Sequence, residues 1–238
     1  MLADILSSDK QLDGNATDIA IRAIWELIVC QDLLPGERTS VIALSDRLGL
    51  SRAPVKEAIT RLAAEGVFEV QERRGTFVAK PDEEDIRDYF ALRRMYEDFA
   101  ASLAVKRISD AEVQHLRKLV QIMKTESVAR KQGQGSIPRY IDADVEFHMK
   151  IVAAASNRML LRHYNSLSLH LRMASYFVSG ARTDSELLHM EHSAILRAVE
   201  GRDGKALQAA LRQHASRVEE KILNSMAEKR RRPIHRVA

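Results

Sequence analysis

The chain has 238 residues, of which 45% are hydrophobic and 29% charged, and this composition is typical of a folded, water-soluble protein with one large domain or two ordinary ones. No apolar run reaches the length of a membrane span, and the single cysteine, Cys30, excludes an intrachain disulfide framework, so we expect a cytoplasmic protein. The formal net charge is +4, but residues 1–80 carry ten Lys and Arg against twelve Asp and Glu. The overall charge therefore does not by itself indicate a nucleic-acid partner.

The first expected elements are a bracing helix and a helix-turn-helix. The bracing helix runs through Ile21 and Val29, with Thr17 or Asp18 as its cap. A short helix over 41–48, a turn that contains Gly49, and a second helix between residues 51 and 66 follow it. Two helices joined by a three-residue turn with glycine are the layout of a helix-turn-helix.

The second helix of this motif has one apolar and one basic side. Val55, Ile59 and Leu62 recur at helical spacing and predict the buried side. Arg52 and Lys56 lie four residues apart and form a polar row elsewhere on the helix. A short helix with a basic leading edge suits the DNA major groove. Taken alone, the same row is also compatible with a solvated helix face.

A β-hairpin is expected directly after the helix-turn-helix. Two β-rich runs, 67–70 and 76–79, flank a turn that contains glycine. Arg73 and Arg74 lie at the tip of this hairpin. A helix-turn-helix followed by a basic hairpin is a winged helix, so the sequence predicts a DNA-binding domain.

Motifs over residues 16–80 resemble the GntR family of bacterial transcription regulators. The matching motifs are Leu34-Pro35-Gly36-Glu37-Arg38, Leu44 to Leu48 with Gly49, Ser51-Arg52-x-Pro54-Val55-Lys56-Glu57-Ala58, Leu62-x-x-Glu65-Gly66 and Arg74-Gly75-Thr76-Phe77-Val78. The resemblance implies binding to double-stranded operator DNA, and the residues expected at the DNA are Arg38, Ser51, Arg52, Lys56, Arg73, Arg74, Gly75 and Thr76. The chain departs from the family at Val41 and Ile42, where members usually carry Glu-Arg and the arginine touches DNA in some of them.

A domain boundary is expected near Lys80 and Pro81, where an acidic run begins a helix. Beyond it the sequence has no strand signal and predicts six helices near 82–107, 109–131, 138–155, 157–179, 184–200 and 203–228. We therefore expect a mainly α protein with three parts: a winged helix-turn-helix domain over 1–80, an all-α effector-binding and dimerisation domain over 81–228, and a disordered basic tail over 229–238.

Polar residues interrupt three apolar helix faces in the second domain. Asp144 and His148 share one face of the third helix, His192 lies in the stripe of the fifth, and His214 lies in that of the last. Buried polar groups need partners, and three imidazoles with a carboxylate can bind one divalent metal. The alternative is that each histidine lies in the core and bonds to backbone or water. The competing histidines are His163, His170 and His189.

Residues 84–226 resemble the FCD effector domain of the FadR-type branch of the same family. The matching motifs are Leu92-Arg93-x-x-x-Glu97, Asp144-x-x-x-His148, Ala155-Ser156-Asn157, Glu191-His192 and Arg212-x-His214. The resemblance implies that Asp144, His148, His192 and His214 bind a divalent metal, with zinc as the first choice and nickel or manganese as alternatives. The resemblance also implies a small carboxylate effector. A domain of six helices, and not seven, is similar to the VanR-type subgroup.

Two further residues are expected at the effector. Arg93 could clamp the far end of a metal-bound carboxylate, and Asn157 would be a second contact. For Arg93 the alternative is a surface ion pair with Glu97 at i,i+4 spacing. For Asn157 the alternative is a helix cap.

These features predict a homodimeric, ligand-responsive repressor that binds inverted half-sites, and the family resemblance implies a small organic acid as the effector and a catabolic operon as the target. One alternative is a metal-dependent hydrolase with a DNA-binding appendage, although the sequence has no HExxH motif and no nucleophile setting beside the ligands. Another alternative is an architectural DNA-binding dimer without a ligand.

Overall fold

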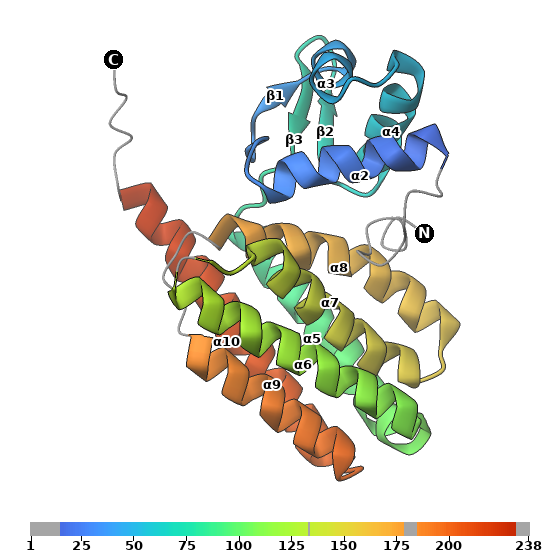
Figure 1. Ribbon diagram of the computed structural model, residues 1–238, viewed down its shortest axis with the longest axis vertical. Helices are drawn as coiled ribbons and strands as arrows, with labels where there is room; N and C mark the ends of the chain where they lie inside the picture. The colour runs from blue at the N-terminus through green and yellow to red at the C-terminus, as the bar shows by residue number, and fades with distance from the viewer. Residues whose placement is uncertain (1–14, 133, 179–184, 232–238) are drawn as a thin grey trace. The chain divides into compact units, whose positions relative to one another are not determined.

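The computed structural model of the protein describes residues 15–132, 134–178 and 185–231 (Figure 1). Within these ranges the secondary structure is helical apart from one three-stranded sheet. One compact unit contains the chain up to Lys80 together with Ser168–Met173, and the other contains the remainder. The predicted mainly α fold, a winged helix-turn-helix with an all-α bundle, is confirmed.

The winged-helix unit begins with α2 (Ala16–Val29), which buries Ile21, Ile24 and Ile28. Its cap is Asn15, whose side chain accepts a hydrogen bond of 3.0 Å from the backbone N–H of Asp18. The prediction of Thr17 or Asp18 as the cap was therefore wrong. Asn, Asp and Thr are all good caps, so the cap depends on which residue takes the extended backbone conformation.

The helix-turn-helix consists of α3 (Val41–Leu48) and α4 (Arg52–Ala64). Ser40 caps α3 through a 3.1 Å bond from the N–H of Ala43, and Gly49 ends it with a left-handed φ of 65°. Ser51 stands at the cap position of α4, but its side chain makes no capping bond. One side of α4 is buried, because its apolar residues recur at helical spacing; they are Val55, Ala58, Ile59 and Leu62.

The wing is an antiparallel sheet of β1 (Arg38–Thr39), β2 (Phe68–Gln71) and β3 (Gly75–Val78), in the order β1-β3-β2. Gly75 has a φ of 115°, and a Cβ there would lie 2.8 Å from Nε of Arg38. Only glycine combines this backbone conformation with so close a neighbour. Gly75 therefore lets the side chain of Arg38 lie close to the backbone at the start of β3, beside the hairpin turn.

The second unit is a bundle of α5 (Glu83–Arg107), α6 (Asp110–Lys131), α7 (Ile137–Ala154), α8 (Arg158–Val178), α9 (Ser185–Glu200) and α10 (Gly204–Arg231). These helices follow the six predicted ranges within a few residues, and Figure 1 shows them running alongside one another. Helix α10 continues through residues 229–231, where the basic tail was expected to begin. Residues 232–238 of that tail lie outside the described residues.

Two capping boxes define where α5 and α6 begin. Asp82 accepts hydrogen bonds from the N–H groups of Glu84 and Asp85, and Asp85 accepts one from the N–H of Asp82. Ser109 and Glu112 form the same reciprocal arrangement at α6. Each box satisfies backbone donors that a helix start leaves free. For the described residues, no helix is long and apolar enough to cross a membrane.

The bundle core brings α7 against α5 and α6, and α10 against α5 and α9. Its fully buried side chains include Leu116, Phe147, Ile151 and Ile195. Because α5, α7, α9 and α10 meet in this way, polar residues on their inner faces can lie close together.

Candidate metal centre and nucleic-acid interface

The basic residues expected at DNA lie on the surface of the winged-helix unit. Arg52 and Lys56 are exposed on α4, and Arg73 and Arg74 are exposed in the turn between β2 and β3. Arg73 has a left-handed φ of 62°, which turns the chain at the tip of the wing. Exposed cations on a helix and on a hairpin tip can contact phosphates without a desolvation cost within the protein.

The other residues expected at DNA are Arg38, Ser51, Gly75 and Thr76, and of these Arg38 and Ser51 are exposed. Thr76 is half-buried and pairs with Thr39 across the sheet, Gly75 accommodates Arg38, and Ser51 is exposed before α4. The side chain of Ile42 is 54% exposed near the start of α3, at the position where the family usually carries a charged residue. This part of the interface is therefore apolar in this chain.

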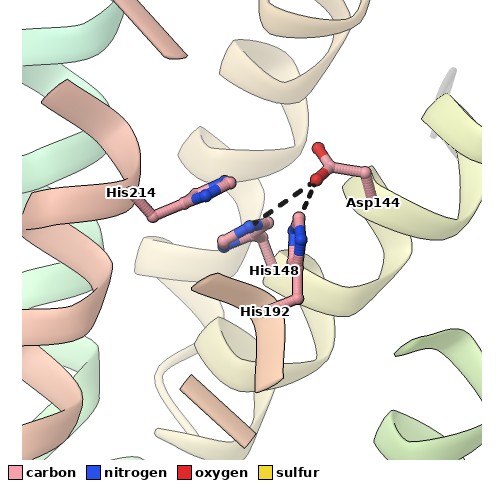
Figure 2. Close-up of side chains that lie close together, drawn as sticks. All are labelled: Asp144, His148, His192 and His214. Carbon is pink, nitrogen blue, oxygen red and sulfur yellow. Dashed lines mark ion pairs between the residues drawn. The ribbon is translucent and has the colours of Figure 1, made fainter. Parts of the chain in front are cut away.

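Four polar residues meet in the middle of the bundle. Helix α7 supplies Asp144 and His148, α9 supplies His192 and α10 supplies His214, and Figure 2 shows the three imidazoles converging near the carboxylate. One potential ligand atom from each residue lies within 4.8 Å of those of the other three. No second group of this kind occurs among the described residues. The competing His163, His170 and His189 are not part of the group.

The carboxylate of Asp144 faces two of the imidazoles. Its Oδ1 lies 2.7 Å from Nε2 of His192 and 4.0 Å from Nε2 of His148 (Figure 2). The rings of His148 and His214 stack with their centroids 5.0 Å apart. All three histidines are buried, whereas Asp144 keeps 18% of its side chain exposed.

Burial and charge favour the protonation states that a metal requires. Burial lowers the pKa of His148 below its ordinary value and lowers the pKa of His214 well below it. Burial alone would raise the pKa of Asp144, but the hydrogen bond with His192 and the neighbouring imidazoles lower it instead. Neutral imidazoles beside an ionised carboxylate are the forms that bind divalent cations.

The residues present fit a divalent cation. Nε2 of His148 and Nε2 of His214 are buried and have no hydrogen-bond partner. Buried polar atoms in proteins nearly always have a partner, and a metal ion would supply one here. Opposite ligands on one ion lie about 4.2 Å apart, so the present spread of 4.8 Å needs only a small closure. Nitrogen and oxygen ligands suit zinc, nickel or manganese.

A buried ion pair lies directly beside this group. Nε of Arg93 donates to Oε1 of Glu97 at 2.9 Å, and the two side chains are 4% and 1% exposed. The i,i+4 pair that the sequence allowed therefore exists, but in the core instead of on the surface. Nη2 of Arg93 is buried without a hydrogen-bond partner, so this guanidinium has a donor left for an anion.

Three residues around the centre, Glu97, Tyr164 and Glu191, were not predicted as site residues from the sequence. The hydroxyl of Tyr164 on α8 donates to Oε1 of Glu97 at 2.6 Å, and Nδ1 of His148 lies 3.1 Å from the same oxygen. Oε2 of Glu191 lies 3.0 Å from Nδ1 of His214. The available signals for Glu191 were its place next to His192 and in the matching Glu191-His192 motif, whereas the contact of Tyr164 is purely tertiary.

Asn157 does not belong to this group. Its side chain is exposed, and its Oδ1 accepts hydrogen bonds from the N–H groups of Met159 and Leu160 at 3.1 and 3.0 Å. These are the bonds of a helix cap. The expectation of an effector contact at Asn157 is accordingly replaced by its alternative, the cap of α8.

Comparisons with known proteins agree with both halves of this description. Residues 17–78 match the bacterial regulatory proteins of the gntR family, and residues 88–217, more than half of the chain, match the FCD domain. The chain belongs to the GntR family and carries an FCD domain. GntR-family members are transcriptional regulators and not enzymes, so the hydrolase alternative has no support.

Individual relatives cover most of this GntR chain. The Nta operon transcriptional regulator of Aminobacter aminovorans is 30% identical over 162 residues, which are 68% of this chain and 74% of the relative. LutR of Bacillus subtilis is 26% identical over 79% of this chain and 93% of its own length. The solved structure of McbR/YncC of E. coli has the same fold, with a TM-score of 0.76 at 18% identity over 90% of this chain and 99% of that chain.

Proposed function

We propose that this GntR-family regulator is a homodimeric repressor that a small organic acid releases from operator DNA by binding at a metal centre in the FCD domain. The observation that carries the proposal is the convergence of three buried histidines and Asp144 beside the unsatisfied guanidinium of Arg93. An architectural dimer without a ligand would have no use for this group, because apolar side chains fill a core at lower cost.

Asp144, His148, His192 and His214 would hold the metal. When bound, the ion supplies a Lewis-acid position for an anionic oxygen of the effector. Arg93 would receive the opposite end of the anion through Nη2, since arginine pairs with carboxylates through charge-assisted hydrogen bonds. We favour zinc because three imidazoles and a carboxylate are usual zinc ligands, with nickel, which also binds imidazole, or manganese, which binds carboxylate, as alternatives.

On the DNA side, two copies would read inverted half-sites. Arg52 and Lys56 on α4 would enter the major groove, and Arg73 and Arg74 would contact the backbone or the minor groove beside it. The repressor role is supported by relatives whose names state it: RspR of E. coli, 25% identical over 80% of this chain, is described as a transcriptional repressor.

The dimer has a candidate surface on α5. Leu92, Met95 and Phe99 are 41%, 55% and 54% exposed and recur at helical spacing on that helix. Exposed apolar side chains grouped on one face mark interaction sites, and a two-fold contact would pair the same stripe from both copies.

Six helices in the described part of the FCD domain support assignment to the VanR-type subgroup.

The experiment that tests the proposal has two steps. Elemental analysis of protein purified without chelator should find about one divalent metal per chain. A panel of small mono- and dicarboxylates is then titrated against a preformed complex with operator DNA. A member of the panel should release the DNA from metal-loaded protein and not from metal-free protein. Release from metal-free protein at the same concentration would refute the metal-centred mechanism.

A further inference from the structure

Two of the three histidines in the candidate centre have a buried carboxylate beside Nδ1. Nδ1 of His148 lies 3.1 Å from Oε1 of Glu97, and Nδ1 of His214 lies 3.0 Å from Oε2 of Glu191. A carboxylate at Nδ1 holds the proton on that nitrogen and leaves Nε2 as the lone-pair donor. Nε2 of both rings is buried without a hydrogen-bond partner. For His214 the contact with Glu191 is a hydrogen bond, whereas for His148 the contact with Glu97 is a close ion-pair approach.

The two carboxylates differ in what else they hold. Oε1 of Glu97 receives the Nε–H of Arg93 at 2.9 Å and the hydroxyl of Tyr164 at 2.6 Å, in addition to facing His148. Glu191 instead pairs with the half-exposed Arg217 at 2.6 Å. One oxygen atom of Glu97 thus serves both a histidine of the metal group and the arginine whose Nη2 is unsatisfied.

We propose that Glu97 and Glu191 are positioning residues of the metal centre, and that Glu97, unlike Glu191, also joins the centre to Arg93 through a shared acceptor atom. The inference rests on the proposed metal site. Each carboxylate fixes the Nδ1–H tautomer of its histidine and strengthens Nε2 as a ligand. Because Arg93 and His148 share one acceptor atom, a change at Arg93 alters the support of His148, and the reverse follows by thermodynamic linkage.

Zinc titration of metal-free protein tests the positioning roles without any effector or DNA. The variants are Glu97→Gln and Glu191→Gln, which keep the side-chain shape and remove the charge. The matched control is Glu126→Gln, because Glu126 is a buried carboxylate of α6 that pairs with Arg139 and accepts from the N–H of Ser136, away from the centre. Loss of an outer carboxylate weakens metal binding about 10- to 100-fold.

The expected result is that Glu97→Gln and Glu191→Gln weaken zinc binding by about 10-fold or more, whereas Glu126→Gln binds zinc like the wild type. Ring ¹⁵N chemical shifts of metal-free protein should show His148 and His214 as Nδ1–H tautomers, with His148 alone changed by Glu97→Gln. Such a shift separates positioning from a general loss of stability. Zinc affinity equal to that of Glu126→Gln, or the opposite tautomer in the wild type, would overturn the positioning roles.

A double-mutant cycle tests the coupling through Glu97. Arg93→Met is combined with Glu97→Gln, and separately with Glu191→Gln, and zinc affinity is measured for each. The Arg93→Met/Glu97→Gln protein also removes both buried charges, so it stays informative if Glu97→Gln alone folds poorly. The effect of Arg93→Met should depend on Glu97 by at least a few-fold and should be independent of Glu191.

Absence of the metal site and absence of the coupling through Glu97 would give different results. A wild type that binds no divalent metal would refute the proposed metal site itself. A wild type that binds zinc, with additive effects of Arg93→Met and Glu97→Gln, would leave that site standing and would overturn only the coupling through Glu97.

Discussion

The winged-helix unit and the helical bundle treat charge in opposite ways. Arg52, Lys56, Arg73 and Arg74 are all exposed, so each is held ready for a polyanion at little cost to the fold. In the bundle, Arg93, Glu97 and the three histidines are buried, and every one of them depends on a neighbour. The surface cations of the winged-helix unit can therefore be replaced one at a time, whereas the buried group of the bundle acts as a unit.

The largest expected effect is on the buried group. His214→Ala removes one metal ligand, so bound metal should be lost together with the stabilisation it gives, about 4 kcal/mol at a thousandfold excess of free metal over Kd. Elemental analysis and thermal unfolding with and without zinc measure both. Operator binding should be retained, because the winged helix has its own core. The control is His163→Ala, which changes an exposed histidine of α8.

A change on α4 should show the reverse pattern. Arg52→Ala should weaken binding to the operator by about 1–3 kcal/mol and leave the zinc content unchanged. Fluorescence anisotropy with operator and with unrelated DNA makes the measurement. Arg61→Ala is the matched control, since Arg61 lies on the same helix but pairs with Glu57 and Asp18. Equal losses on both DNA sequences would mean that Arg52 contacts phosphate and does not read bases.

The wing should contribute through charge alone. Arg73→Ala combined with Arg74→Ala should reduce the slope of log affinity against log salt by about two, since each phosphate contact contributes roughly one unit. Operator binding at a series of salt concentrations gives the slope. If the slope is the same as in the wild type, the wing does not lie against the DNA backbone.

The smallest effect is expected at Asn157, the cap of α8, which the sequence had suggested as an effector contact. Asn157→Ala should destabilise the bundle by about 1 kcal/mol, and Asn157→Asp should restore most of that stability, because both Asn and Asp cap helices. Chemical denaturation measures the free energy of unfolding. Release of DNA by the effector should occur at the same effector concentration in both variants, and a large shift would return Asn157 to the effector site.

The sequence predicted the helices well because their apolar periodicity is long and their stop signals are strong. It also placed Asp144, His148, His192 and His214 on inner faces, since a polar residue within an apolar stripe is visible without a structure. It missed β1, because two residues are too short for any periodicity.

The contacts around the metal centre could not be predicted from the sequence, because they depend on how the helices pack. The i,i+4 spacing of Arg93 and Glu97 is the same on a surface and in a core, so their burial depends on what packs against α5. The hydrogen bond from Tyr164 joins residues 67 positions apart. Contacts of this kind follow from the packing of helices and leave no local pattern.

Helix α5 runs unbroken from the boundary of the winged-helix segment to the residues beside the candidate metal centre. It is 25 residues long, about 37 Å, and it runs without a break from the Asp82 cap past Arg93 and Glu97. The cap fixes its first turn only two residues after Lys80, where the winged-helix unit ends. Because no loop interrupts α5 between Asp82 and Arg93, a movement of the helix at Arg93 would be carried along it toward the cap.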